Sequence, residues 1–241
     1  MARHFLRLKA ALLASAFKRG WQHALGLIAG VLFGLPLALG LALGLALAAR
    51  LDAGPALYVL ASALLAIGWA VMPVLFFGLD ETLDPARLWL LPLSRRQLLG
   101  GLTVSASLGI MPVVTLLLLA AGFAHARAPA GVLIVAAAVI VQFLICLWAG
   151  RALATALSAT LRSRKGRDIA AAAAVLVGLA FAGIGQVPNL VFNVLGDGPD
   201  VGARIGAALD RAAGVVALTP PGWAGGAVAA VAEGQIGRAH V

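Results

Sequence analysis

Residues 21–49 read WQHALGLIAGVLFGLPLALGLALGLALAA, a run that contains no Asp, Glu, Lys or Arg. About 20 apolar residues in a helix cross the roughly 30 Å hydrocarbon core of a bilayer. The run is also longer than the roughly 7–15 apolar residues at the centre of a cleaved signal peptide. It therefore predicts a membrane-spanning helix.

Four more uncharged runs follow, at residues 53–79, 97–126, 128–150 and 169–196. Each is long enough for one helix, and a helix satisfies all of its backbone polar groups internally in lipid. We predict an all-α integral membrane protein with a helix bundle over residues 21–187. Its spans are expected near 24–49, 55–78, 97–124, 132–156 and 168–187.

The composition of the whole chain agrees with this prediction. Of its 241 residues, 62% are hydrophobic and only 11% are charged, and the mean hydropathy is +1.03. Soluble domains average about 25% charged residues. A soluble enzyme and a disordered tail are excluded, and a single cysteine, Cys146, excludes a disulfide scaffold.

The net charge of +9 is explained by membrane topology rather than by nucleic-acid binding. Cations gather before residue 20, between spans 2 and 3, and after span 4, whereas the opposite side has only Arg50 and Arg127 before the tail. Because cytoplasmic loops are rich in Lys and Arg, the amino terminus is predicted to be cytoplasmic. The loop after span 4 holds Arg162, Arg164, Lys165, Arg167 and Asp168. We interpret this basic loop as a topological anchor that is attracted to anionic lipid headgroups.

Residues 1–20 are too short and too basic to span a membrane, and their leucines can share one helical face. They predict an interfacial helix, the alternative being a plain basic tail. In span 1, small residues recur at a spacing that lets helix backbones approach closely, although an Ala/Gly-rich composition alone produces such patterns. The glycines concerned are Gly26, Gly30, Gly34, Gly40 and Gly44.

Three prolines, Pro36, Pro73 and Pro112, fall inside predicted spans, where each removes a backbone hydrogen bond and allows a kink. Kinked spans favour a transporter or channel over a simple anchor. Span 4 also contains a neutral polar residue, Gln142, which we interpret as an interhelical hydrogen-bond partner.

The cytoplasmic loop 80–96 contains a short helix of its own. Asp84 and Pro85 form a helix start, with a carboxylate cap followed by a proline at the first helical position. Pro92 ends the helix, and Ser94 to Gln97 has the spacing of a capping box that opens span 3. The helix carries Trp89 and several leucines, so it either lies on the bilayer or docks into a partner protein.

Three segments together resemble the permease subunits of bacterial ABC-2-type exporters. They are DETLDPARLWLLPLSRRQLLGGL (80–102), ALATALSATLRSRKGRDIAAAAAVL (152–176) and LTPPGWAGGAVAAVAEG (218–234). The resemblance implies a multi-pass protein of the bacterial inner membrane with an elbow helix at residues 1–20. It also implies that the loop between spans 2 and 3 couples to a separate ATPase subunit. The implied coupling residues are Asp80, Glu81, Asp84, Pro85, Arg87, Leu88, Trp89, Leu90, Arg95 and Arg96.

The resemblance places ATP and Mg²⁺ on that partner subunit, and this chain is expected to carry no cofactor and no catalytic residues. None of its three lysines follows a glycine, so the GK[ST] ending of a Walker A loop is absent from the sequence. A further expected partner is a second permease half or a missing carboxy-terminal half.

Residues 188–235 are predicted to form an external region, in which 201–216 is helical and partly amphipathic. The uncharged stretch 212–232 is broken by Pro220 and Pro221 and is not predicted to be a span. The last residues, IGRAHV (236–241), match a reading-frame translation of a short-read sequencing adapter. The chain is therefore expected to be a carboxy-terminally truncated fragment.

Two other functions compete with the exporter. An intramembrane prenyltransferase would hold Mg²⁺ and a diphosphate on Asp80 and Asp84, but Phe76 stands where that pattern has Asn. A secondary transporter needs ionisable groups inside the membrane for ion coupling. Spans 1, 2, 3 and 5 offer none near their centres beyond the neutral Gln186 and Asn189.

Overall fold

The computed structural model describes residues 30–75, 110–161 and 201–234 continuously, with single positions at 28, 100, 103 and 107 and several between 165 and 186. All regular structure within these residues is helical, which confirms the predicted all-α class. The chain divides into two compact units, each described by itself. One comprises Met1–Ala46 and Gly78–Ala121, and the other Leu47–Phe77 and Gly122–Val241.

The first unit contains η1 (Gly30–Gly34), most of α3 (Leu35–Ala48) and α7 (Ile110–Ala120). Here η1 is a π-helical segment that ends just before Pro36. Proline has no N–H and its ring clashes with the carbonyl four residues earlier, so the helix widens at this point. Pro112 lies near the beginning of the described part of α7 and is buried.

Three helices form the core of the second unit: α4 (Gly54–Leu75), α8 (Pro129–Leu161) and α11 (Trp223–Ala232). Each of them contacts the other two, and α4 runs through Pro73 without interruption. The buried positions of α8 recur at helical spacing, at Val135, Gln142 and Cys146. This single inward-facing stripe is typical of a helix packed on one side.

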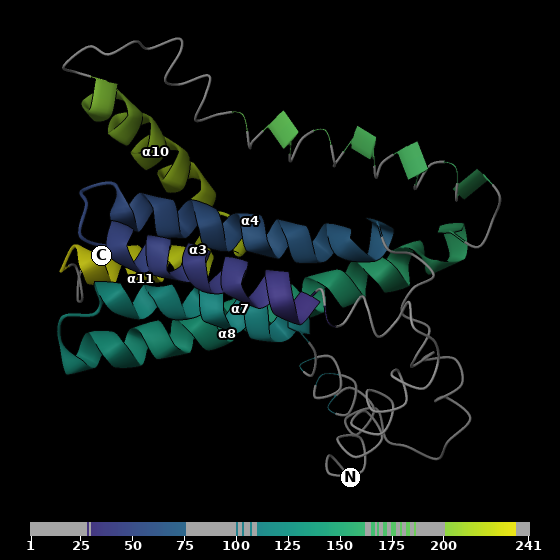
Figure 1. The fold of residues 1–241 in the computed structure, drawn as a ribbon, viewed down its shortest axis with the longest axis horizontal. Helices are drawn as coiled ribbons and strands as arrows, with labels where there is room; N and C mark the ends of the chain where they lie inside the picture. Colours follow the sequence, from purple (N-terminus) through teal and green to yellow (C-terminus); the bar gives the residue numbers. More distant parts are fainter. Residues whose placement is uncertain are drawn as a thin grey trace. The chain divides into compact units, whose positions relative to one another are not determined.

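The segment after residue 200 folds as a bent pair of helices (Figure 1). The first, α10 (Val201–Ala217), is followed by the 3-10 turn η4 (Pro220–Gly222) and then by α11, and the chain bends by 114° at this break. Near the turn, α10 packs against α4 through a small core of Ala56, Val59 and Ala213. The predicted helix at 201–216 and the predicted break at the two prolines are both confirmed.

Three helical stretches of the described residues are long and apolar enough to cross a membrane: Val31–Ala48, Gly54–Val71 and Pro129–Leu153. The bent pair at 201–232 makes a fourth if it is counted as one span, and Ile110–His125 is a shorter apolar helix, α7 continued by η3 (Ala121–His125). These stretches agree with predicted spans 1, 2 and 4 and with the end of span 3. The expected elbow at 1–20 and residues 236–241 lie outside the described residues. Of the fifth span at 168–187, only scattered single positions and pairs are described.

Candidate functional site

A buried glutamine joins three helical elements at the centre of the second unit. The amide nitrogen Nε2 of Gln142, on α8, donates one hydrogen bond to the carbonyl oxygen of Ser62 on α4, at 2.9 Å. It donates a second to the carbonyl oxygen of Pro221 in η4, at 3.0 Å. Gln142 is only 1% exposed. The predicted role of Gln142 as an interhelical hydrogen-bond partner is confirmed.

Small residues bring the three elements close enough for these bonds. A Cβ atom added to Gly225 of α11 would lie 2.9 Å from Cα of Val59 and would also collide with Oγ of Ser62. The Ser62 hydroxyl itself donates to the Val59 carbonyl at 2.9 Å. On α8, a Cβ at Gly131 would lie 3.0 Å from Cγ1 of Val231. Glycine is therefore required at Gly225, where the backbones of α11 and α4 nearly touch.

The turn itself is closed by hydrogen bonds to its own carbonyls. Thr219 Oγ1 donates to the Val216 carbonyl at 2.6 Å, and the indole Nε1 of Trp223 donates to the Leu218 carbonyl at 3.2 Å. The bond from Gln142 to Pro221 adds a third such contact. The carbonyl groups of Val216, Leu218 and Pro221, which lie at the helix break, therefore each accept a hydrogen bond from a side chain. The Oε1 atom of Gln142, in contrast, is buried without a hydrogen-bond partner.

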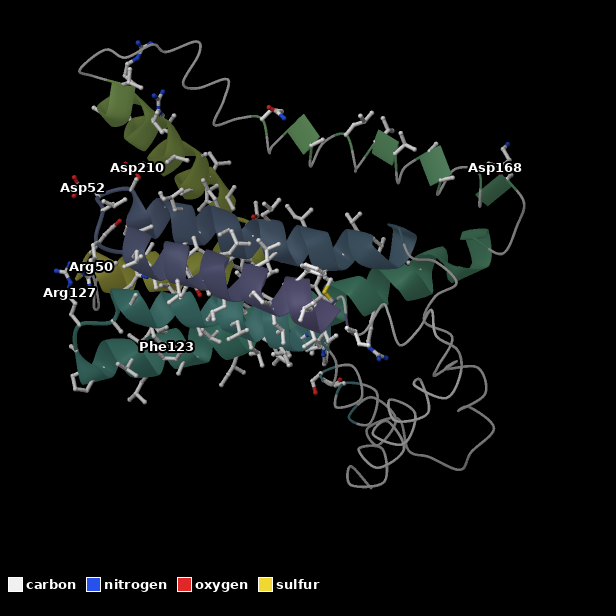
Figure 2. All side chains as sticks on the ribbon, in the orientation of Figure 1. Arg50, Asp52, Phe123, Arg127, Asp168 and Asp210 are labelled. Atoms are coloured by element: carbon white, nitrogen blue, oxygen red, sulfur yellow. The ribbon has the colours of Figure 1, made fainter. Side chains whose placement is uncertain are left out.

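A second polar pair lies at the end of the unit that bears Arg50, Asp52 and Arg127 (Figure 2). The rings of Tyr58 and His125 are tilted at 58° with their centroids 5.5 Å apart, and each residue is 3% exposed. The ring nitrogens of His125 are buried without a hydrogen-bond partner. Burial lowers the pKa of His125 below its ordinary value of 6.5, and the nearby backbone of Gly122 and Gly54 only partly offsets this shift.

This burial predicts an acid-sensitive fold. Because the pKa of His125 is lower in the folded chain, the unfolded chain binds more protons below about pH 6.5, so stability is lost as pH falls through that value. Each unit of pKa difference corresponds to about 1.4 kcal/mol. We expect the melting temperature in detergent to be flat above pH 7 and to fall towards pH 5, with a smaller fall in His125→Phe. Parallel curves for the two proteins would contradict the assignment to His125.

Most of the residues that the sequence singled out lie outside the described residues. This holds for every coupling residue between Asp80 and Arg96, for the basic-loop residues Arg162, Arg164 and Arg167, and for Gly26. Lys165 and Asp168 are described and exposed. A Cβ at Gly34, Gly40 or Gly44 would meet nothing within 4 Å, so helix packing through the span 1 glycines stays a prediction.

The site contains residues that the sequence did not single out. Ser62 and Tyr58 on α4 and His125 after α7 stand in uncharged runs to which only a membrane span was assigned, and Pro221 was predicted only to break a helix. Their rarity could have identified them, since few polar side chains occur in these apolar runs. A polar group that is buried in such a run needs a hydrogen-bond partner. Within the described part of the chain, no group of three or more His, Cys, Asp and Glu side chains is placed to hold a metal ion.

Comparison of the chain with protein-family models, with curated proteins and with solved structures finds no match.

Proposed function

We propose that this chain is the membrane-spanning permease subunit of an ATP-driven exporter of the ABC-2 type. The observation that carries the proposal is the helix break at Pro220–Gly222, which lies beside the middle of α8 and is bonded there by Gln142. Non-helical backbone at membrane depth is tolerated where protein satisfies it, as in the broken helices of transporters. A simple membrane anchor has no need of such a break.

The ATP-driven part of the proposal rests on sequence. The segment 80–96 resembles the coupling helix of these permeases, and the chain has no Walker A ending of its own. The distribution of Lys and Arg puts that segment and the basic loop 162–168 on the cytoplasmic side. An ATPase at this face would bind Leu88, Trp89 and Leu90 as packing anchors, with Asp84, Arg87 and the Arg95–Arg96 pair as polar contacts.

The same distribution of Lys and Arg predicts which side of the membrane each end of the second unit faces. The end that bears Arg50, Asp52 and Arg127 (Figure 2) faces the outside, and the far end of α8 faces the cytoplasm. The resemblance to bacterial ABC-2-type permeases supports placing the chain in the inner membrane of a bacterium. A second permease half or a further carboxy-terminal segment completes the transport path in this proposal.

A charge placed on the coupling segment tests the proposal. The natural gene and its flanks are sequenced first, and the chain is co-expressed with the ATPase encoded beside it. Trp89→Asp should reduce ATPase recovery on the tagged permease at least tenfold, because a carboxylate replaces the central apolar anchor. Trp89→Phe, which keeps an aromatic ring, should recover nearly as much as the natural chain. Equal recovery with Trp89→Asp, or flanks without any Walker A protein, would contradict the proposal.

A further inference from the structure

We propose that the exposed face of α8 binds one anionic phospholipid of the inner leaflet, with the guanidinium of Arg151 on the lipid phosphate and the ring of Trp148 beside it. The acyl chains of this lipid lie along the apolar part of the same helix face. The inference requires only that α8 crosses a membrane with its far end in the cytoplasm, and it does not depend on the exporter proposal.

The first argument is the depth of Arg151. Helix α8 begins at Pro129, two residues after Arg127, and Arg127 lies at the end of the unit that is assigned to the outside (Figure 2). Arg151 follows twenty-two residues after Pro129 in the same helix, which is about 33 Å at 1.5 Å per residue. The hydrocarbon core is about 30 Å thick. A helix that starts at the outer surface therefore carries Arg151 to the level of the inner phosphates.

The second argument is the direction in which this part of α8 faces. Leu147 is buried, and a Cβ atom added to Gly150 would lie 2.7 Å from the carbonyl oxygen of Trp69, so these positions face α4. Successive residues of a helix are turned by about 100°. Trp148 and Arg151, each one position further along, therefore turn away from the contact with α4. Trp148 is 58% exposed and Arg151 is half-buried.

The third argument is the apolar strip that leads to Arg151. Leu133, Ile140, Leu144 and Trp148 are all exposed. With about 3.6 residues per turn, these four side chains and Arg151 share an arc of about 80° on α8. From Ile140 to Arg151 the helix rises about 17 Å, which is close to half of the roughly 30 Å core. The strip therefore matches the acyl chain of one leaflet, with a cation at its headgroup end.

The chemistry of the two residues fits a phosphate at this level. Arg151 is the one charged residue in the sequences of α4 and α8, and a guanidinium binds phosphate oxygens through paired N–H donors. Arg151 also interacts within the chain, but its five N–H donors can serve both contacts. The amphipathic ring of Trp148 is of the kind that favours the headgroup level.

Charge balance indicates which phospholipid fits best. A headgroup with a single negative charge neutralises one guanidinium, whereas a zwitterionic headgroup brings an ammonium group next to it. The nearby loop at 162–167 adds four more cations on the same side of the membrane, and these also disfavour an ammonium group. We therefore expect phosphatidylglycerol to bind in preference to phosphatidylcholine.

Retention of lipid by the purified full chain tests the inference. The chain is reconstituted in nanodiscs with equal amounts of phosphatidylglycerol and phosphatidylcholine and transferred to a mild detergent, and retained lipids are counted by native mass spectrometry. The natural chain should retain phosphatidylglycerol about fivefold more often, because the phosphate contact is charge-assisted. Arg151→Gln should remove this preference, and Trp148→Ala should at least halve it.

The matched control is Arg204→Gln, which removes an exposed cation from α10 and should leave the preference unchanged. Melting temperature separates a lipid contact from a structural role. Added phosphatidylglycerol should raise it in the natural chain but not in Arg151→Gln. If Arg151 were only structural, the variant would melt earlier and still gain from the lipid, which would overturn the proposal.

Three results on retention would also overturn the site. They are equal retention of the two lipids by the natural chain, an unchanged preference in Arg151→Gln, and an equal loss of preference in Arg204→Gln. If Arg151→Gln does not fold, Trp148→Ala decides the question, because that side chain is exposed and its loss leaves no cavity. An unchanged preference in Trp148→Ala would then count against the site.

Discussion

Replacing Gly225 with leucine is expected to prevent α11 from packing on α4 and to abolish recovery of folded protein. The first atom of the new side chain would lie 2.9 Å from Cα of Val59, a backbone atom that cannot rotate away. Overpacking of a core typically costs about 1–3 kcal/mol, and a backbone collision exceeds this range because the helices must separate. The measurement is the monodisperse peak in detergent size-exclusion chromatography together with the melting temperature.

Gly214→Leu is the matched control, because it makes the same replacement inside α10, where an added Cβ would meet nothing within 4 Å. We expect it to be recovered normally and to melt within a few degrees of the natural chain, since Gly is unfavourable in a helix interior. If the two variants behave alike, α11 does not lie against α4 as described.

Replacing Tyr58 with alanine is expected to have the next largest effect. The ring is 3% exposed, stacks at a tilt against His125, and its hydroxyl lies 2.6 Å from the position of a Cβ added to Gly122. Large-to-small changes of buried aromatic residues cost about 3–5 kcal/mol because a cavity remains. We expect a large fall in melting temperature, and also a weaker pH dependence, because water would then reach His125.

Phe123→Ala serves as the control for Tyr58→Ala. Phe123 is two residues from His125 but 40% exposed, and Figure 2 labels it near the same end of the molecule. Its loss should lower the melting temperature only slightly. An equal loss of stability in both variants would show that the burial of Tyr58 is not what holds this end of the unit together.

The helices themselves were predictable from sequence because a membrane span is a local property. Runs without charge gave the stretches around Val31–Ala48, Gly54–Val71 and Pro129–Leu153, and each is a helix. The break at Pro220 and Pro221 was also local, since proline lacks the donor that a helix needs. Gln142 could be named as a hydrogen-bond partner because an amide in an apolar helix has few other ways to be satisfied.

Other features depend on residues far apart in the chain and were not predictable. Helix α8 continues to Leu161, beyond the expected end of span 4 near residue 156, because nothing in the sequence TALSATL at 155–161 ends a helix. The glycine pattern of span 1 was conspicuous, yet the close approach occurs at Gly225, whose partner Val59 stands far away in the sequence. The Tyr58–His125 pair likewise requires knowledge of which helix ends meet.

The length of α8 has a mechanical consequence. It runs from Pro129 to Leu161 with no proline after its first residue, so it contains no built-in hinge. From Gln142 to Leu161 the helix measures about 28 Å, and a sideways shift of about 2.5 Å at its far end tilts the whole rod by about 5°. A displacement at the Leu161 end is therefore expected to tilt α8 as one rigid helix about the contacts that Gln142 makes with Ser62 and Pro221.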